Sequence, residues 1–179
     1  MSGIATPTSA DARGLSLALP DPDATTALGE RLAATRPPSA TVFLDGQLGA
    51  GKSHLARAML RALGVAGAIK SPTYTLVERY ALRDREDPGE AAHLDLYRVA
   101  AAGELEFLGL DAIADEVTLW LVEWPDRGAG ALPAPDLRVL IAVEGEGRAV
   151  RLEPGSAVGQ GWLARLAEST GLPTVVTPR

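Results

Sequence analysis

The stretch DGQLGAGKSHLARAML, from Asp45 to Leu60, governs how the rest of the sequence is interpreted. Four of its residues occupy the defining positions of the pattern G-x-x-x-x-G-K-[ST]: Gly46, Gly51, Lys52 and Ser53. Small residues in such a loop let successive backbone N–H groups approach phosphate oxygens, which larger side chains would block. The pattern therefore predicts a phosphate-binding loop.

The flanking segments place this loop between a strand and a helix. The apolar, β-branched run ATVFLDG predicts a strand, and KSHLARAMLRALG has helical periodicity up to Gly64. We expect Lys52 to reach the β- and γ-phosphates of a nucleotide and the Ser53 hydroxyl to bind Mg²⁺. The residues predicted to contact the nucleotide here are Gly46, Leu48, Gly49, Ala50, Gly51, Lys52, Ser53 and His54.

Length and charge restrict the classes of function. The 179 residues are enough for one domain, and Lys+Arg 17 against Asp+Glu 23 gives a net charge of -6, which argues against unaided binding of nucleic acid. The chain has no cysteine, so it forms neither disulfides nor thiolate metal sites. Without a leader-like or membrane-length apolar segment in the sequence, we expect a cytoplasmic protein that does not enter a membrane.

The order of periodic segments predicts the architecture. Residues 1–13 and 169–179 are expected to be flexible ends, and 14–168 a single P-loop ATPase domain. Strands alternate with helices, and hairpins are expected at 73–99 and 135–154, with the second turning at EGEG. This order predicts an α/β fold: a P-loop NTPase-like three-layer sandwich with a mixed β-sheet and helices on both faces.

The apolar run VTLWLVE ends at Glu123, and Trp124 follows it directly. A phosphate-binding loop needs a carboxylate for its metal, ordinarily at the end of a neighbouring strand, so Glu123 is the candidate for holding Mg²⁺ directly or through water. The alternative is an ordinary solvent-exposed glutamate. Trp124 is either a base-stacking residue at the rim of a nucleotide site or part of the core.

In HLDLYR, strand alternation places His93, Asp95 and Tyr97 on one face. Asp95 is the candidate for orienting or deprotonating an attacking water, or for joining the metal shell. The alternative is a structural aspartate that caps Arg98 or a backbone turn. We interpret His93 as structural, because no partner histidine lies nearby in the sequence.

The segment KSPTYT presents hydroxyl groups at Ser71, Thr73 and Thr75 beside a stiffening proline. After the helix of a phosphate-binding loop, such a segment can sense the γ-phosphate and become ordered when nucleotide binds. A plain polar turn leading into a strand is the alternative.

Five segments in order, GQLGAGKS, SPTYTLVE, HLDLYRV, ELEFLGL and LVEWP, resemble the bacterial TsaE (YjeE) family. The members of this family are small ATPases required for threonylcarbamoyladenosine formation on tRNA. The resemblance runs from about Pro20 to Pro135. It implies hydrolysis of ATP with Mg²⁺ in a cytoplasmic complex with the TsaB and TsaD proteins, with tRNA contacted only through that complex.

The resemblance also implies roles for matching residues. Lys52, Asp95 and Glu123 would be catalytic, and Ser53 and Glu123 would hold the metal. Thr73 would belong to a switch segment, and Trp124 would lie near the nucleotide. Ser53 stands where the family often has threonine, and both residues offer a hydroxyl.

Adenine contacts are implied less directly. The segment DATTALG resembles the opening helix of the family, whose start approaches the adenine, so Asp23 to Thr25 are candidates. Beyond Pro135 the match thins, and Arg148 in GEGR is a further candidate for an adenine contact.

Two other functions remain open. A small-molecule kinase also uses this loop, but it usually needs converging arginines and a lid, whereas the arginines of this sequence are scattered and RDREDPGE is mixed in charge. A nucleotide-dependent interaction module would keep the loop and lack a competent Asp95.

Overall fold

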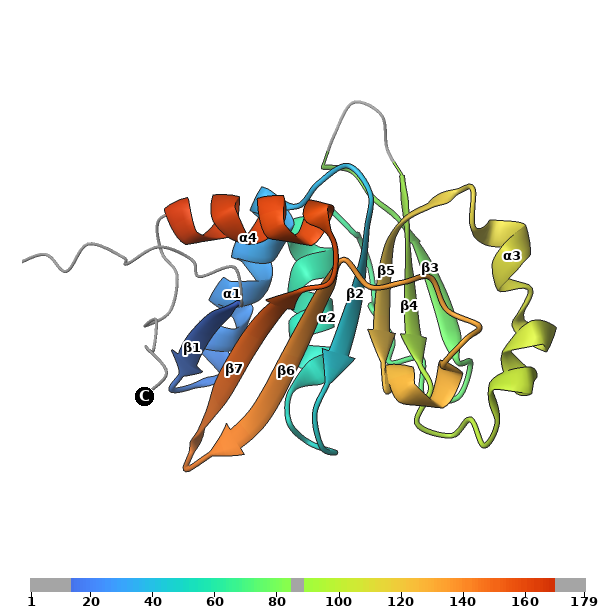
Figure 1. Cartoon of the computed structure of the whole chain (residues 1–179), viewed down its shortest axis with the longest axis horizontal. Helices are drawn as coiled ribbons and strands as arrows, with labels where there is room; N and C mark the ends of the chain where they lie inside the picture. Colours follow the sequence, from blue (N-terminus) through green and yellow to red (C-terminus); the bar gives the residue numbers. More distant parts are fainter. Residues whose placement is uncertain (1–13, 85–88, 170–179) are drawn as a thin grey trace, which may run out of the picture.

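The computed structural model describes residues 14–84 and 89–169 (Figure 1). Of the segments expected to be flexible, 1–13 and 169–179, all residues lie outside the described ranges except Ser169, which caps α4. In chain order the elements are β1 (Leu15–Leu19), α1 (Pro22–Thr35), β2 (Ala40–Asp45), α2 (Lys52–Ala62), β3 (Val77–Ala81), β4 (Glu90–Asp95), the 3-10 helix η1 (Ala102–Leu108), α3 (Leu110–Ile113), β5 (Val117–Glu123), the 3-10 helix η2 (Pro125–Gly128), β6 (Leu137–Glu144), β7 (Gly147–Pro154) and α4 (Ala157–Glu168).

All seven described strands form one mixed sheet in the order β1-β7-β6-β2-β5-β4-β3, which confirms the predicted mixed sheet. The four central strands β6, β2, β5 and β4 are parallel, and antiparallel strands flank them on each side. The predicted hairpins are β3–β4 and β6–β7, and the second turns where Glu144 pairs with Gly147.

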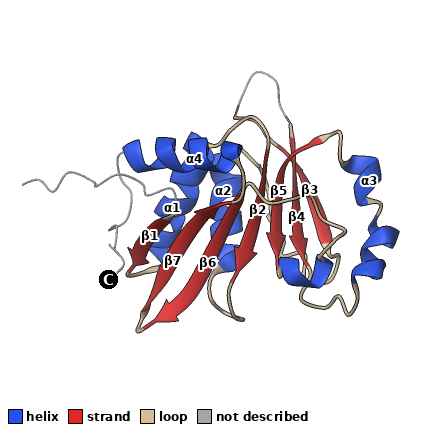
Figure 2. Cartoon of the chain, in the orientation of Figure 1, coloured by secondary structure: helices blue, strands red, loops and turns tan. Residues whose placement is uncertain are grey.

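Two apolar clusters lie on opposite faces of the sheet. The larger cluster joins α1, α2 and α4 to the strands, and Trp162 of α4 is fully buried in it. The smaller cluster packs Leu105 of η1 and Leu110 of α3 against β4 and β5. Helical segments therefore cover both faces, although α3 lies only at the β4–β5 half of the sheet (Figure 2). Among the described residues, no helix has the length and apolar character needed to span a membrane.

Two predicted strand boundaries are wrong. The strand expected at 73–80 begins only at Val77, because a turn closed by the 2.8 Å hydrogen bond from Leu76 N to Pro72 O precedes it. The next strand ends at Asp95, so Tyr97 lies beyond it. Helix α1 begins at Pro22, and Asp21 accepts the capping hydrogen bond from Ala24 N.

The carboxyl ends of β2, β5 and β4 lie at one edge of the sheet, where their arrowheads point in Figure 1. Glu123 at the end of β5 is in register with Leu44 of β2 on one side and Asp95 of β4 on the other. The loop between β2 and α2 begins at this same edge, so the topology brings the candidate residues together.

Helix α2, which follows this loop, packs closely against α1. Gly29 of α1 is buried, and a Cβ atom at that position would lie 2.5 Å from the Ala58 Cβ of α2. Gly161 of α4 lies in a helix as well, but a Cβ there would have only the end of Arg165, at 3.6 Å, as a neighbour.

We predict that Gly29→Ala lowers the free energy of unfolding by about 1–3 kcal/mol, because α1 and α2 must move apart. The control Gly161→Ala should raise it by about 0.5–1 kcal/mol, since alanine is the better helix former and the site has space. Urea unfolding followed by circular dichroism measures both changes. Equal effects of the two substitutions would show that helix contact does not limit position 29.

Candidate functional site

The loop from Gly46 to Gly51 connects β2 to α2 and depends on glycine at two positions. A Cβ atom at residue 46 would lie 2.5 Å from the backbone oxygen of Ile141, so only glycine fits beside β6. Gly51 has φ 112°, which side chains other than hydrogen rarely allow. These two constraints turn the chain from the sheet edge into the helix.

Helix α2 begins at Lys52, and no described side chain caps its first turn. The first N–H groups of a helix lack partners within the helix and carry the positive end of its dipole. This end of α2 is therefore suited to an anion, in particular a phosphate.

The Lys52 side chain folds back over the loop. Its Nζ donates to the backbone oxygens of Gly46 at 2.6 Å and Gln47 at 2.9 Å, and it lies 4.3 Å from the ring centroid of Trp124. Burial lowers the pKa of this ammonium group, while Glu123 and other nearby carboxylates oppose that effect. Because burial makes the charged form of Lys52 less favourable, an anion that bound beside it would stabilise that charged form.

Ser53 and Glu123 lie in direct contact. Ser53 Oγ is 2.9 Å from each carboxylate oxygen of Glu123, and Glu123 is only 2% exposed. The alternative of a solvent-exposed Glu123 is therefore wrong. A hydroxyl and a carboxylate are the oxygen ligands that Mg²⁺ prefers when substrate phosphates and water complete its shell, so these residues fit the metal.

His93 is a member of this site that the sequence reasoning did not assign to it. Its ring is fully buried, and its Nε2 lies 2.8 Å from Glu123 Oε1. Because a carboxylate only accepts, Nε2 carries the proton, while Nδ1 has no hydrogen-bond partner among the described residues. The alternation in HLDLYR placed His93 beside Asp95, but the pairing of β4 with β5 that brings it to Glu123 is not visible in the sequence.

Asp95 joins the end of β4 to the segment after α2. Its Oδ1 accepts a hydrogen bond from Tyr97 N at 3.0 Å, which is the turn-capping alternative, and its Oδ2 accepts one from Thr73 Oγ1 at 3.2 Å. Ser71 Oγ lies 2.8 Å from Thr73 Oγ1, whereas Thr75 turns away to Glu78. Of the three predicted hydroxyls, Thr73 lines the pocket, and Ser71 contacts Thr73 from outside it.

These side chains surround a pocket of about 430 Å³. It is lined by Leu48, Gly49, Gly51, Lys52, Ser53, His54, Arg57, Thr73, Asp95, Tyr97, Arg98, Glu123 and Trp124. Gly46 and Ala50, which were predicted to contact the nucleotide, lie outside this lining; their backbone oxygens accept hydrogen bonds from Lys52 and Arg148 respectively. Arg57 and Arg98 were not predicted. Arg57 lies four residues after Ser53 in α2, so helical spacing could have indicated it, whereas Arg98 follows β4 and its distance from the glycine loop gave no signal. Trp124 is half-buried at this rim and also packs on the smaller apolar cluster.

A second, smaller pocket of about 110 Å³ lies on the other side of the loop. Thr25, His54 and Arg148 are among its lining residues, whereas Asp23 is not. Arg148 donates to the backbone oxygens of Ala50 at 2.7 Å and Gly49 at 3.3 Å, so it also holds the loop in place. His54 Nε2 lies 2.9 Å from Thr26 Oγ1 and ties α2 to α1.

Together these features define a mixed α/β protein with a glycine-rich loop that opens a helix at the carboxyl edge of its sheet. The family model for threonylcarbamoyl adenosine biosynthesis protein TsaE matches residues 19–150. The chain therefore belongs to the TsaE family of tRNA threonylcarbamoyladenosine biosynthesis proteins.

Individual relatives agree with this assignment. The tRNA threonylcarbamoyladenosine biosynthesis protein TsaE of Haemophilus influenzae is 40% identical over 119 residues, which are 66% of this chain and 73% of the relative. The protein of the same name from Streptomyces coelicolor is 34% identical over 139 residues, 75% of this chain and 91% of the relative. The crystal structure of Bacillus subtilis YdiB superposes with a TM-score of 0.70 at 24% identity, covering 87% of this chain and 95% of that one, and shares the fold.

We predict that His93→Phe lowers the free energy of unfolding by about 1–3 kcal/mol, because it keeps the bulk of the ring and removes a hydrogen bond to a buried carboxylate. The control His54→Phe removes the only other imidazole, whose hydrogen bond is half-exposed, and should cost less than about 1 kcal/mol. Chemical denaturation of both variants checks this. A His93→Phe protein as stable as the wild type would contradict it.

Proposed function

We propose that this chain is an ATP-binding and hydrolysing, Mg²⁺-dependent subunit that acts with TsaB and TsaD in threonylcarbamoyladenosine modification of tRNA. The observation that carries the proposal is the convergence of Lys52, Ser53, Asp95 and Glu123 on one pocket at the start of α2. We further propose that residues 14–168 form a single P-loop NTPase-like domain.

The loop and Lys52 would bind the triphosphate. The first N–H groups of α2 lie at the end of the helix that borders the pocket. Lys52 would exchange its backbone acceptors, Gly46 and Gln47, for phosphate oxygens. Because burial already disfavours the charged ammonium, the negative phosphate would recover part of that cost. Thr25 and Arg148, in the small pocket behind the loop, are the residues we propose for the adenine side.

Ser53 and Glu123 would hold the metal, and His93 would keep the Glu123 carboxylate in place. When bound, Mg²⁺ neutralises charge that develops on the phosphate oxygens. The His93 hydrogen bond to Oε1 fixes that oxygen and leaves Glu123 oriented toward Ser53. Such an arrangement needs little rearrangement when the metal arrives.

Asp95 is the residue we propose for the attacking water. Its Oδ1 is occupied by the backbone of Tyr97, which fixes the carboxylate, and its Oδ2 faces Thr73. A nucleotide that contacted Thr73 would release this oxygen to accept a hydrogen bond from water. Thr73 would then act as the sensor of the γ-phosphate in a switch segment.

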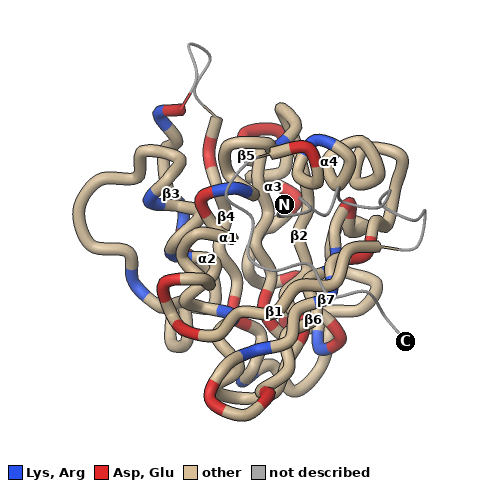
Figure 3. The backbone as a smooth tube through the Cα atoms, turned by 90° about the vertical axis from the view of Figure 1, so that its left-hand side faces the viewer, with Lys and Arg blue, Asp and Glu red and all other residues tan. Residues whose placement is uncertain are grey.

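The charge of this chain favours contact with tRNA through a protein partner over direct binding of tRNA by the chain itself. Figure 3, in which the β1 edge of the sheet faces the viewer, shows acidic and basic residues interspersed along the described backbone. With a net charge of -6, the chain would gain little from tRNA phosphates on its own. We therefore propose that tRNA is contacted only through the complex, in the cytoplasm.

A small-molecule kinase remains a second candidate, because Arg57 and Arg98 both line the pocket and could meet an acceptor phosphate. The deciding experiment measures ATP hydrolysis by the purified chain alone, with TsaB and TsaD of the same organism, and with phosphate-accepting metabolites. Stimulation by the two proteins supports the proposal, whereas ATP loss that requires a metabolite and yields its phosphorylated product supports the kinase.

We predict that Lys52→Ala weakens the binding of Mg·ATP about tenfold to a hundredfold, as expected for lost hydrogen bonds between charged groups. The only other lysine, Lys70, is exposed and outside the pocket, so Lys70→Ala is the matched control and should bind normally. Isothermal titration calorimetry gives both affinities. Normal affinity and hydrolysis in Lys52→Ala would rule out the loop assignment.

We predict that Asp95→Asn binds ATP within about threefold of wild type, while hydrolysis falls about a hundredfold or more, because general-base assistance is lost. Asparagine retains an oxygen for the Tyr97 N–H, so the turn should persist. Asp115→Asn, in an exposed position outside the pocket, is the control. Hydrolysis at the wild-type rate in Asp95→Asn would favour a nucleotide-dependent interaction module instead.

A further inference from the structure

Two pockets border the glycine-rich loop, and the larger one, here called the large pocket, contains an arginine without a partner. Among the charged residues that line it, Arg57 alone makes no hydrogen bond, ion pair or ring contact with the described part of the chain. Lys52, Asp95 and Glu123 are hydrogen-bonded, and Arg98 stacks on an aromatic ring. Because Arg57 is half-buried and its donors are unmet, it is suited to an anionic ligand.

Helix geometry carries the Arg57 side chain back toward the loop. Residues four apart lie on the same face of a helix, so Arg57 shares the face of Ser53. Helical side chains also tilt toward the N-terminus, so a long side chain covers the turn that precedes its own Cα atom. The guanidinium therefore belongs beside the first turn of α2, in agreement with its place in the lining of the large pocket.

The two pockets correspond to opposite ends of a nucleotide. The small pocket, which we propose for the adenine side, is lined by Thr25 and Arg148 and not by Arg57. The large pocket is lined by Arg57 together with Thr73 and Asp95, the residues proposed for the γ-phosphate and the attacking water. A nucleotide that crossed the loop from the small pocket to the large one would bring its terminal phosphate, rather than its base, near Arg57.

The lining of the large pocket is positive, although the whole chain is acidic. Lys52, Arg57 and Arg98 line it against the carboxylates of Asp95 and Glu123, whereas the chain has a net charge of -6. ATP has one more charged phosphate group than ADP, and a planar guanidinium can donate two hydrogen bonds to such a group. ADP would leave the donors of Arg57 as unmet as they are in the free chain.

We infer that Arg57 binds the γ-phosphate and so makes this chain prefer ATP to ADP. This role rests on the proposed function, because it takes Mg·ATP as the ligand of the large pocket. Lys52 would contact both the β- and the γ-phosphate, whereas Arg57 would contact the γ-phosphate alone. Once that phosphate had been removed and released, the contact with Arg57 would be lost, and ADP would be held more weakly than ATP.

The test compares binding of the two nucleotides to variants at position 57. Arg57→Gln removes the charge, and Arg57→Lys keeps the charge without the planar fork. Arg31→Gln is the matched control, because Arg31 is also half-buried in a helix, its side chain has no partner among the described residues, and it lies outside both pockets. Isothermal titration calorimetry in the presence of Mg²⁺ gives the affinities for ADP and for AMPPNP, an ATP analogue that resists hydrolysis.

We expect Arg57→Gln to bind AMPPNP about tenfold more weakly and ADP within about twofold of wild type, as for a lost hydrogen bond between charged groups. Arg57→Lys should lose less affinity for AMPPNP, and Arg31→Gln should bind both nucleotides normally. An equal loss for the two nucleotides, or no loss, would overturn the role of Arg57 alone. A wild-type chain that binds neither nucleotide would overturn the proposed function as well.

Two further measurements separate this role from other roles of Arg57. The urea midpoint of Arg57→Gln should equal that of wild type, since no described residue bonds to the guanidinium; a lower midpoint would make Arg57 a structural residue instead. If Arg57 met the acceptor of a kinase, Arg57→Gln would bind both nucleotides normally and raise only the KM for the phosphate-accepting metabolite. That result would overturn the inference while leaving ATP binding in place.

Discussion

The contact between Ser53 and Glu123 is the constraint around which the site is organised. It joins the first turn of α2 to the end of β5, and both oxygens of the carboxylate lie 2.9 Å from the serine hydroxyl. Since Glu123 is almost fully buried, its charge needs donors on every side, and His93 from β4 supplies another. The loop, the helix and two strands are therefore held at one point.

Buried charge at this point has both a cost and a use. Lys52, Asp95 and Glu123 are each less than a tenth exposed, and the cation and the two carboxylates partly offset one another. Lys52 meets backbone oxygens and the Trp124 ring in place of water. Groups that are desolvated and held in place before a substrate arrives can act on its charge without first reorganising solvent, which is the arrangement that the proposed hydrolysis would require.

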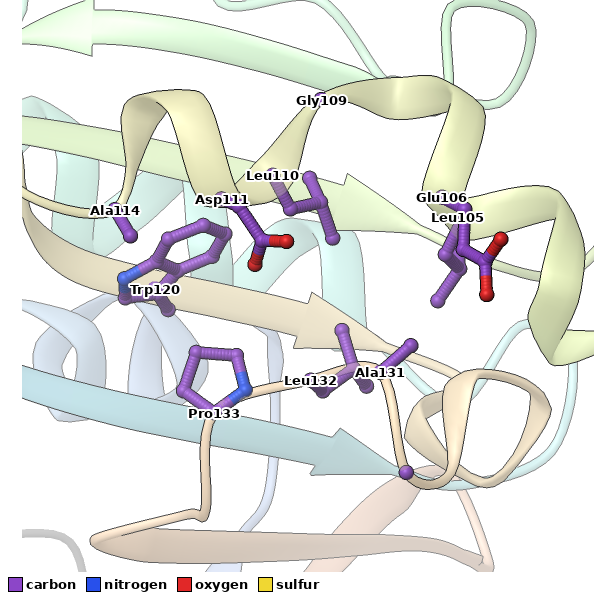
Figure 4. Close-up of a pocket in the computed structure, with 11 residues that line it drawn as sticks. Leu105, Glu106, Gly109, Leu110, Asp111, Ala114, Trp120, Ala131, Leu132 and Pro133 are labelled. Carbon is purple, nitrogen blue, oxygen red and sulfur yellow. The ribbon is translucent and has the colours of Figure 1, made fainter.

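The two faces of the sheet carry different surfaces. On one face α1, α2 and α4 complete a continuous apolar cluster, and the loop at its edge leads to the pocket lined by Lys52 and Glu123. On the other, η1 and α3 cover β4 and β5 but leave a cavity of about 510 Å³ beside Trp120 (Figure 4). Strand β5 borders both spaces: Trp120 lines the cavity, and Glu123, three residues later, lines the pocket.

The sequence by itself determined the loop, the helix after it and the mixed sheet, because glycine placement and hydrophobic periodicity are local properties. It also pointed to Glu123 and Asp95, which end apolar runs. It did not predict the turn that delays β3 until Val77, since TYTLVERY alternates in a way that is also typical of a strand.

Only the tertiary structure decided which of these residues meet. The parallel register of β4 on β5 brings His93 to Glu123, and the path of the chain after α2 brings Thr73 to Asp95. Arg98, which follows β4, reaches the pocket at the start of α2 for the same reason. Strand order and register depend on packing between distant segments, and neighbouring residues in the sequence carry little information about that packing.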